Sequence, residues 1–350
     1  MTTGSPFPAS DDITALAVPD LLAQAHRHVG PALRRAVSGL HPELHRICGY
    51  HFGWFEQDGS PASGAACGKA MRACLVLLSA ASPHPDHATA LQGAAAVELL
   101  HNWTMLHDDV MDGDKLRRGR ATAWSVYGTD WAVLTGDALW AAANRCLLLA
   151  DGQGAAALAL LMNTAAALIN GQAADLDLTR RTPASIAVDE YATMAAGKTS
   201  ALLECALGIG AALGGASEPT VQQLQRAGHY LGIAWQAAND IEDIWSDPAV
   251  TGKPAMNDLR ERKPTLPLIA ALHTRGAAAH TLARAVREGA VWPPPHDLAV
   301  LIEQAGGRAA AQSLSDDYLA TALAHLDRSG LPPDVGTAMK RLFRFIVTRA

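Results

Sequence analysis

The segment VELLHNWTMLHDDVMDGDKLRRGR (residues 97–120) carries the strongest structural signal in the chain. Four of its residues are spaced by four, three and four positions, which places them along one stripe of an α-helix. They are His101, Met105, Asp108 and Asp112. Asp108 and Asp112 therefore point the same way, one helical turn apart. Two carboxylates aimed at one space repel each other unless a cation lies between them.

The ligand chemistry of this pair favours magnesium. Mg²⁺ prefers oxygen ligands, retains several waters and takes further ligands from substrate phosphates. An EF-hand calcium loop fits poorly, because Met111 and Leu116 occupy positions that such a loop makes polar. A solvated acidic helix end is the other alternative, but the stripe is otherwise apolar. The cations that follow suit a polyanionic substrate such as a diphosphate. They are Lys115, Arg117, Arg118 and Arg120.

A second acidic cluster, in GIAWQAANDIEDIWSDPAVTGKPAMNDLRERKPTLP (232–267), repeats this arrangement. One helical stripe contains Gln236, Asp240, Asp243 and Asp247, and another contains Asn239, Asp243 and Asp247. We expect this helix to end at Pro248. Further cations follow at Lys253, Arg260, Arg262 and Lys263. If the two acidic helices face each other in a bundle, they can hold several Mg²⁺ ions around one diphosphate.

Three shorter segments add polar residues. CGKAMR (67–72) supplies Lys69 and Arg72, GQAADLD (171–177) supplies Gln172 and Asp175, and AAGKTSALLE (195–204) supplies Lys198. Each has an ordinary alternative. The first pair can be solvated, and the second can be an exposed polar patch. Lys198, in an apolar helix, either snorkels to solvent or is held by an anion.

The remaining sequence predicts an all-α fold. The pattern is helical nearly throughout from about residue 13, without a period-two run of strand length. Gly- and Pro-rich breaks separate the expected helices at 59–64, 82–86, 180–185, 214–219, 292–297 and 330–334. We expect one large helical bundle over residues 13–350, with ligands in a central cavity. Residues 1–12, rich in Ser, Pro and Thr, are expected to form a disordered tail.

Bulk properties exclude several classes of protein. The formal net charge is −6, so nucleic acid is not expected as the main partner. The five cysteines lack metal-ligand spacing, which argues against a zinc site or disulfide framework and predicts a cytoplasmic location. The first residues lack the basic and apolar regions of a signal peptide, so we expect none there. The chain has no stretch of about 18 uninterrupted apolar residues, so we expect no membrane span.

Taken together, the ordered motifs resemble those of the trans-isoprenyl diphosphate synthases, from about residue 67 to 268. They are HDDVMD followed by LRRGR, then TGDAL (135–139), GQAAD, GKTS, NDIED, GKP and RKPTLP. The resemblance implies the helical isoprenoid synthase fold and Mg²⁺-dependent prenyl transfer. In that reaction an allylic diphosphate ionises, and the double bond of isopentenyl diphosphate attacks the resulting carbocation.

The resemblance also implies roles for individual side chains. Several Mg²⁺ ions would be bound by Asp108, Asp112, Asn239 and Asp243. Isopentenyl diphosphate would be held by Lys69, Arg72, His101 and Arg118. The allylic diphosphate would be held by Arg117, Lys198, Lys253 and Lys263. Thr199 and Gln236 would present oxygens towards the carbocation, so catalysis would depend on Asp108, Asp112, Lys198, Thr199 and Gln236.

The chain also departs from the family pattern. Asn239 stands where the family usually has Asp, and an amide oxygen can coordinate Mg²⁺ but carries no charge. Ala70 and Ala73 replace a usual Arg and Pro beside the isopentenyl diphosphate residues. The series Asn239, Asp243 and Asp247 also resembles the second metal motif of class I terpene cyclases. Two alternatives therefore stay open: a terpene cyclase on the same fold, and a non-catalytic partner subunit.

Trp103 is the candidate determinant of product length. It lies five residues before Asp108, about 7.5 Å back along the helix axis, where a bulky ring would form the floor of the chain pocket. Thr104, four residues before Asp108, leaves part of that floor open. In the family this combination resembles synthases of geranylgeranyl diphosphate (C20), and farnesyl diphosphate (C15) is the second choice. The alternative is that Trp103 is simply a core residue.

Two further expectations rest on the resemblance alone. The family implies a homodimer. Some of its members are cargo of protein nanocompartments, so the tail at residues 1–12 is a candidate targeting segment for such a shell.

Overall fold

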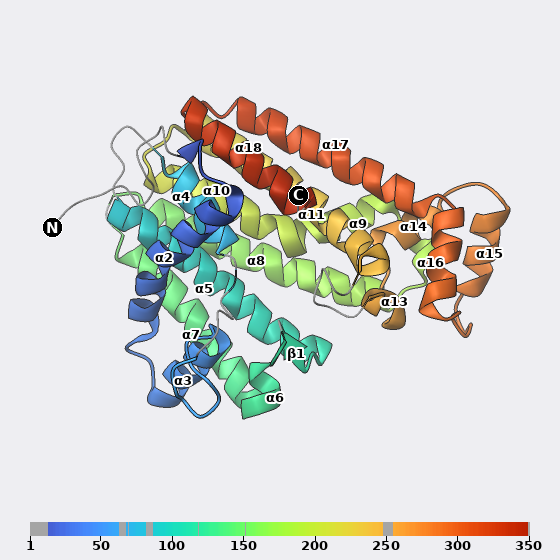
Figure 1. The fold of residues 1–350 in the computed structure, drawn as a ribbon, viewed down its shortest axis with the longest axis horizontal. Helices are drawn as coiled ribbons and strands as arrows, with labels where there is room; N and C mark the ends of the chain where they lie inside the picture. The colour runs from blue at the N-terminus through green and yellow to red at the C-terminus, as the bar shows by residue number, and fades with distance from the viewer. Residues whose placement is uncertain are drawn as a thin grey trace. The chain divides into compact units, whose positions relative to one another are not determined.

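The computed structural model describes residues 13–62, 68, 70–81, 87–117, 119–150, 152–247 and 255–348. The tail expected at residues 1–12 lies outside the described residues, as do the predicted ligands Lys69, Arg118 and Lys253. Within the described chain the prediction of an all-α fold is confirmed, because helices form almost all of the regular structure (Figure 1).

The order of elements follows the chain from blue to red in Figure 1. The elements are α2 (Val18–Val37), α3 (Pro42–His51), α4 (Met71–Ser79), α5 (His87–Asp112), β1 (Leu116–Arg117), β2 (Arg120–Ala121), α6 (Ala123–Tyr127), α7 (Thr129–Leu148), α8 (Gly154–Thr179), the 3₁₀ turn η1 (Pro183–Ser185), α9 (Val188–Ala195), the π-helical segment η2 (Ala196–Ser200), α10 (Ala201–Leu213), α11 (Glu218–Trp245), α13 (Asn257–Arg260), α14 (Leu266–Leu272), α15 (Ala277–Ala285), α16 (Pro295–Gln304), α17 (Gly307–Asp327) and α18 (Pro333–Thr348).

Prolines mark several helix starts. Pro42, Pro295 and Pro333 are the first residues of α3, α16 and α18, a position where the missing N–H is not needed and the fixed φ suits a helix. The breaks predicted at 180–185, 214–219, 292–297 and 330–334 all fall at helix boundaries. Helix α11 ends at Trp245, three residues before the predicted stop at Pro248.

The sequence missed one small element. Strands β1 and β2 pair antiparallel, with Leu116 opposite Ala121 and Arg117 opposite Arg120. Gly119 has a φ of 76° in the connecting turn, a conformation that glycine adopts at little cost. Two-residue strands are too short to show alternation, so periodicity could not reveal them. The hairpin holds the cationic motif that follows the first acidic cluster.

The described chain divides into two compact units. The first comprises residues 1–165, 202–225 and 326–342, and the second comprises residues 166–201, 226–325 and 343–350, apart from those not described. The prediction of a single domain over residues 13–350 therefore stays a prediction.

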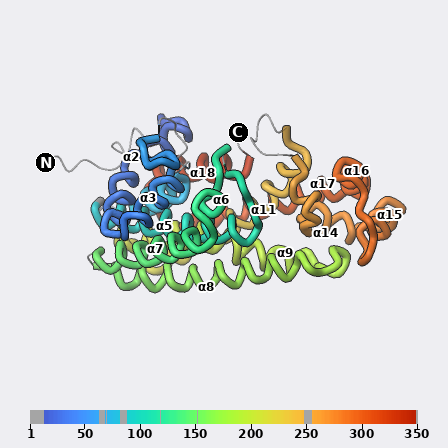
Figure 2. The backbone as a smooth tube through the Cα atoms, turned by 90° about the horizontal axis from the view of Figure 1, so that it is seen from below, coloured from blue at the N-terminus to red at the C-terminus, as the bar shows by residue number. Residues whose placement is uncertain are grey.

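In the first unit, α5 packs against α7, α4 and α2, and α5 and α7 run side by side in both ribbon views (Figures 1 and 2). Small residues permit close contact. A side chain at Gly136 of α7 would collide with the His107 ring of α5. A side chain at Gly210 of α10 would collide with Ser79 and the Val76 carbonyl of α4. Leucines fill the core between these helices: Leu75, Leu99, Leu100, Leu106 and Leu139.

The second unit has two hydrophobic clusters that meet at α14. One surrounds Tyr191 of α9 and Ile269 of α14. The other surrounds Leu268 of α14, with side chains from α15 and α16 such as Leu282 and Ile302. Helix α14 contributes to both clusters, so the segment that leads into it begins beside the core. That segment includes the predicted ligand Lys263.

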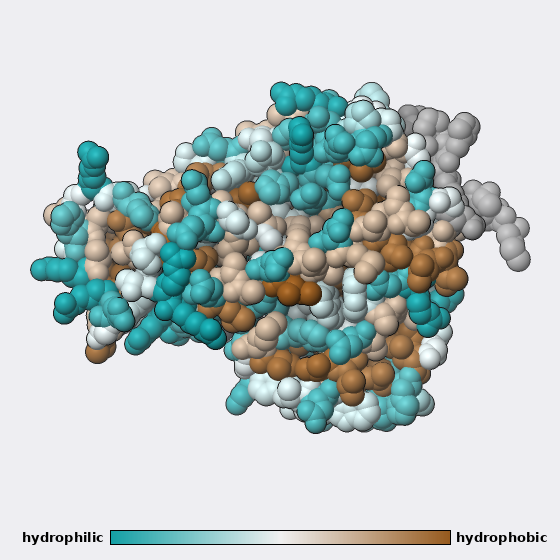
Figure 3. All heavy atoms as spheres, turned by 180° about the vertical axis from the view of Figure 1, so that it is seen from behind, coloured by the Kyte–Doolittle hydropathy of each residue, from teal (hydrophilic) through white to brown (hydrophobic). Residues whose placement is uncertain are grey.

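Large apolar side chains also reach the surface, and hydrophobic residues are visible in brown in Figure 3. By exposed fraction, the large apolar side chains at the surface of α7 and α8 include Trp131, Val133, Leu134, Leu148, Met162, Ile169 and Leu176. By length and composition alone α8 could cross a membrane. Core helices of soluble proteins satisfy the same criterion, and 39% of the apolar window of α8 is buried within the protein.

Candidate active site

The first acidic stripe lies at the C-terminal end of α5. Met105 is buried, Asp108 is half-buried and Asp112, the last residue of the helix, is exposed. The helix stops at Gly113, which has a φ of 71°. Asp108 and Asp112 thus lie one turn apart on an ordered helix, as the spacing predicted, with access to solvent at the helix end.

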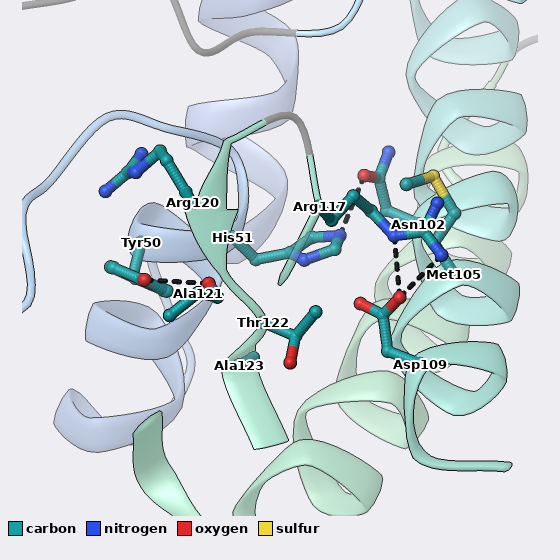
Figure 4. Close-up of a pocket in the computed structure, with 10 residues that line it drawn as sticks. All are labelled: Tyr50, His51, Asn102, Met105, Asp109, Arg117, Arg120, Ala121, Thr122 and Ala123. Atoms are coloured by element: carbon teal, nitrogen blue, oxygen red, sulfur yellow. Dashed lines mark hydrogen bonds and ion pairs between the residues drawn. The ribbon is translucent and has the colours of Figure 1, made fainter. Parts of the chain in front are cut away.

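Asp109, which the sequence analysis did not select, anchors the cationic hairpin. Its side chain is almost fully buried, and Arg117 donates to Oδ1 from Nε at 2.6 Å and from a terminal nitrogen at 2.5 Å (Figure 4). Burial raises the pKa of Asp109, and the pairing with Arg117 opposes that rise. The helix spacing could have revealed this role, because Asp109 is rotated about 100° from Asp108, towards the packed side of α5.

Figure 4 shows the pocket that surrounds this pair. Its lining residues are Tyr50, His51, Asn102, Met105, Asp109, Arg117, Arg120, Ala121, Thr122 and Ala123. Tyr50 donates to the Ala121 carbonyl at 2.8 Å, and His51 and Asn102 are hydrogen-bonded at 3.0 Å. Arg120 pairs with Glu56 and stacks over the Tyr50 ring. These contacts fix the hairpin to α3 and α5, so Arg117 is held in place.

The start of α4 contains the predicted ligand Arg72, which is half-buried. Glu98 of α5 is buried and accepts a hydrogen bond from the Ala73 N–H at 3.0 Å. A carboxylate at a helix N-terminus is stabilised by the exposed N–H groups there. This bond fixes the start of α4 to α5, the helix that carries His101. Glu98 was also missed from sequence, since no local pattern connects it with residue 73.

In the second unit, Lys198 is held by an anion. Its ammonium donates to Asp175 of α8 at 2.5 Å, and both side chains are mostly buried. Lys198 lies in the π-helical segment η2, and such segments often occur at functional sites. Backbones approach closely here, because a side chain at Gly171 would lie 2.3 Å from backbone atoms of Gly197 and Lys198. Two motifs that the sequence showed separately, GQAAD and GKTS, are therefore in direct contact.

Next to Lys198, a chain of hydrogen bonds reaches the second acidic helix. Thr199 donates to Gln236 Oε1 at 2.6 Å, and Gln236 Nε2 donates to Asp240 Oδ1 at 3.0 Å. Asp240 Oδ2 accepts from the Tyr191 hydroxyl and the Leu266 N–H. Burial raises the pKa of Asp240 to about 6, and these three bonds oppose the rise. Asp240 thus points into the protein rather than towards a ligand.

Asn239 and Asp243, the predicted ligands on α11, are both half-buried. Asp243 Oδ2 accepts from the Asp258 N–H at 3.1 Å. The Asp258 carboxyl has a pKa raised to about 7, first by burial and then by Asp240 and Asp243. Lys263 lies 2.9 Å from Glu261 and 3.7 Å from Asp258. Asp258 is therefore an additional acidic group of this site, which the sequence analysis did not select.

The donor chemistry of the predicted ligands fits magnesium. Asp108 and Asp112 on α5, and Asn239 and Asp243 on α11, offer only oxygen atoms. In the part of the chain that the structure describes, no three His, Cys, Asp or Glu side chains form a preassembled metal cage. Mg²⁺ does not require such a cage, because it commonly binds one or two carboxylates together with waters and substrate phosphates.

Trp103 packs between α5 and α7. Its ring stacks on Trp140 of α7, with centroids 5.4 Å apart and planes 29° from parallel, and meets the His107 ring edge to face. Both tryptophans are half-buried, so one face of the Trp103 ring is fixed by packing and part of the side chain remains accessible to solvent or a ligand. The contact with Trp140 was not evident from the sequence, because the two residues lie on different helices.

The chain is similar to proteins of one known family. The polyprenyl synthetase family model matches residues 62–291. Geranylgeranyl diphosphate synthase of Mycobacterium tuberculosis is 42% identical over 319 residues, or 90% of each chain. (2E,6E)-Farnesyl diphosphate synthase of Mycobacterium bovis is 36% identical over 98% of this chain and 96% of its own. The crystal structure of a polyprenyl synthetase from Streptomyces coelicolor A3(2) has a TM-score of 0.87 at 40% identity, covering 95% of this chain and all of that one.

The Asp109–Arg117 pair generates a stability prediction. Arg117→Met leaves the buried carboxylate without its cation and should lower the free energy of unfolding by about 3 kcal/mol. Without Arg117 the pKa of Asp109 rises further above its unfolded value. A carboxyl whose pKa is raised in the folded state lowers the free energy of unfolding as pH increases. The difference in this free energy between variant and parent protein should therefore be larger at about pH 8 than at about pH 5.

Urea unfolding at the two pH values measures this effect. The double variant Asp109→Asn, Arg117→Met removes the stranded charge and should recover part of the loss. The exposed Arg180→Met is the control and should stay within about 0.5 kcal/mol of the parent protein. A pH-independent deficit, or no recovery in the double variant, would contradict the role assigned to the pair.

Proposed function

Because the chain belongs to the polyprenyl synthetase family and is a trans-prenyltransferase, we propose that it elongates an allylic diphosphate with isopentenyl diphosphate to give geranylgeranyl diphosphate. Farnesyl diphosphate is the second choice of product. Both choices have support from relatives, and the relative named for the C20 product is the more similar of the two, at 42% against 36% identity. Trp103 at the fifth position before Asp108, with the small Thr104 at the fourth, also favours C20.

One observation carries this proposal: two helices that each bear oxygen ligands and are each followed by cations. We assign the binding of Mg²⁺ to Asp108, Asp112, Asn239 and Asp243. We assign the allylic diphosphate to Arg117, Lys198 and Lys263, with Lys253 added from sequence alone. Arg72 and His101 would hold isopentenyl diphosphate, with Lys69 and Arg118 added from sequence alone.

The chemistry divides between ion and protein. Bound Mg²⁺ would neutralise charge on the leaving diphosphate. Lys198 and Arg117 supply cationic hydrogen-bond donors to phosphate oxygens, and their carboxylate partners fix them before substrate arrives. Thr199 and Gln236 offer oxygens to the developing cation. The protein otherwise positions the two substrates and excludes water.

A product assay tests this function against the two alternatives. The purified protein is incubated with Mg²⁺, labelled isopentenyl diphosphate and, in turn, dimethylallyl, geranyl and farnesyl diphosphate. We expect a labelled C20 alcohol after dephosphorylation. A cyclic hydrocarbon formed without isopentenyl diphosphate would indicate a terpene cyclase. Absence of turnover with every starter would indicate a non-catalytic subunit.

Metal dependence gives a sharper prediction. Asp108→Ala or Asp112→Ala should each lower kcat by about 100-fold, because each removes a ligand from a shared site. Asn239→Asp should lower the Mg²⁺ concentration needed for half-maximal activity, because a carboxylate binds Mg²⁺ more tightly than an amide. Asp130→Ala, an exposed acid on α7, is the control. Near-normal turnover of either alanine variant would refute the metal assignment. So would near-normal turnover of the parent protein in excess chelator.

Product length is tested at Trp103. Trp103→Ala removes the ring that stacks on Trp140, so the pocket should deepen and the main product should gain at least one C5 unit. Met162→Ala, at an exposed position of α8 in the same unit, should leave product length unchanged. Product chromatography provides the measurement. An active, folded Trp103→Ala protein with the parental products would show that chain length is set elsewhere.

We also propose a cytoplasmic homodimer. Helix α7 exposes Trp131, Leu134 and Leu148 at 37%, 53% and 67%, a large apolar area for a free helix face, which a second copy would cover. Sedimentation velocity should therefore show a dimer, and Leu134→Glu should shift it towards monomer. A monomeric parent protein at working concentration would count against the dimer. Binding of the tail at residues 1–12 to a nanocompartment shell stays a prediction from sequence.

A further inference from the structure

Asp240 is a buried carboxylate that joins three separate elements of the second unit. Its side chain lies on α11 and is 4% exposed. Oδ2 accepts from the Tyr191 hydroxyl of α9 at 2.6 Å and from the Leu266 N–H at the start of α14 at 2.8 Å. Oδ1 accepts from Gln236 Nε2 at 3.0 Å, one turn earlier on α11. Three donors on one buried carboxylate satisfy most of its hydrogen-bonding capacity.

This arrangement decides which way the Gln236 amide faces. A carboxylate that already holds two donors offers Gln236 only an acceptor, so the NH₂ group of Gln236 must point to Asp240. Its carbonyl oxygen then points the opposite way, to Thr199, whose hydroxyl donates to it at 2.6 Å. With the amide reversed, Gln236 Oε1 would face the Asp240 carboxylate, and two acceptors in contact at a buried site repel each other.

We propose that Asp240 and Tyr191 are positioning residues that fix the carbonyl oxygen of Gln236 on the reacting side of the site. The inference rests on the proposed function, in which Gln236 and Thr199 present oxygens to a cationic carbon. A reversed amide would present an NH₂ group instead, which repels a cation. Tyr191 is included because its hydroxyl donates to Asp240 Oδ2, the carboxylate oxygen that does not contact Gln236. Tyr191 is only 2% exposed.

The same carboxylate also anchors the cationic loop. Leu266, whose N–H binds Asp240, follows Lys263 by three residues, and the Thr265 N–H donates to the Lys263 carbonyl at 3.0 Å. One buried group therefore sets the position of a neutral oxygen on α11 and of the backbone that carries a diphosphate cation. Asp240 acts through these neighbours, since its own oxygens are occupied by protein donors.

An exchange of amide and carboxylate tests the proposal. In Asp240→Asn, the new amide oxygen can still accept from Tyr191 and Leu266, but the new NH₂ group faces Gln236 and reverses that amide. We expect kcat to fall by about 100-fold, with KM for both substrates within about threefold. Adding Gln236→Glu restores an acceptor towards this NH₂ group and an oxygen towards Thr199, at the same total charge as the parent protein. The double variant should regain at least about tenfold of the lost kcat.

Smaller changes and a binding readout complete the test. Tyr191→Phe should lower kcat by about tenfold in the parent protein but have little effect in the Asp240→Asn background, because both act through one amide. Tyr318→Phe, a hydroxyl deletion elsewhere in the second unit, is the matched control. Calorimetry with an allylic diphosphate analogue carrying an ammonium at the cationic carbon should show weaker binding to Asp240→Asn, while a neutral isostere binds unchanged.

The possible results separate the two claims. A parental kcat in Asp240→Asn, or equal loss of affinity for the ammonium and neutral analogues, would overturn the positioning role. So would a double variant that is no better than Asp240→Asn with both proteins folded, as judged by thermal unfolding. A parent protein that elongates no allylic diphosphate would instead overturn the proposed function. The analogue measurement decides the positioning role even then, because it needs no turnover.

Discussion

Carboxylates held away from water need a cation or several hydrogen-bond donors, and this requirement organises the polar residues of each unit. Asp109 has Arg117, Asp175 has Lys198, and Asp240 has a tyrosine, an amide and a backbone N–H. The first pair closes a hairpin eight residues further along the chain, whereas the other two link segments that are more distant in the sequence. Asp108 and Asp112 differ, because they lie at a helix end that solvent can reach. The proposed metal ion and its diphosphate would approach them from that side.

The pairing of cations with carboxylates bears on substrate binding. Each described residue assigned to the allylic diphosphate already lies beside an acid: Arg117 beside Asp109, Lys198 beside Asp175 and Lys263 beside Glu261. A cation held in this way loses less side-chain freedom when a phosphate arrives, so less of the binding free energy is spent on ordering it. Metal ions bound with the diphosphate would compensate the acids that share these cations.

The features that could be predicted from the sequence are those that depend on residues close together in the chain. The spacing of Asp108 and Asp112 indicated their common face on α5, and Pro- and Gly-rich segments indicated the helix boundaries. It did not predict contacts between distant segments, such as Tyr191 with Asp240 or Trp103 with Trp140, because these depend on packing. The two-residue hairpin was missed because it has no period. Asp109 was recoverable, since its rotation from Asp108 on the helix is fixed by geometry.

The central proposal, which comes from the sequence motifs, is that both acidic helices serve one diphosphate. A crystal structure of the protein with Mg²⁺ and a non-ionising thio-analogue of the allylic diphosphate measures this most directly. If the proposal is right, metal ions should bridge one diphosphate to Asp108 and Asp112 of α5 and to Asp243 of α11, and Lys198 and Arg117 should contact its oxygens. Metal ions confined to one helix, or a diphosphate bound away from both, would contradict it.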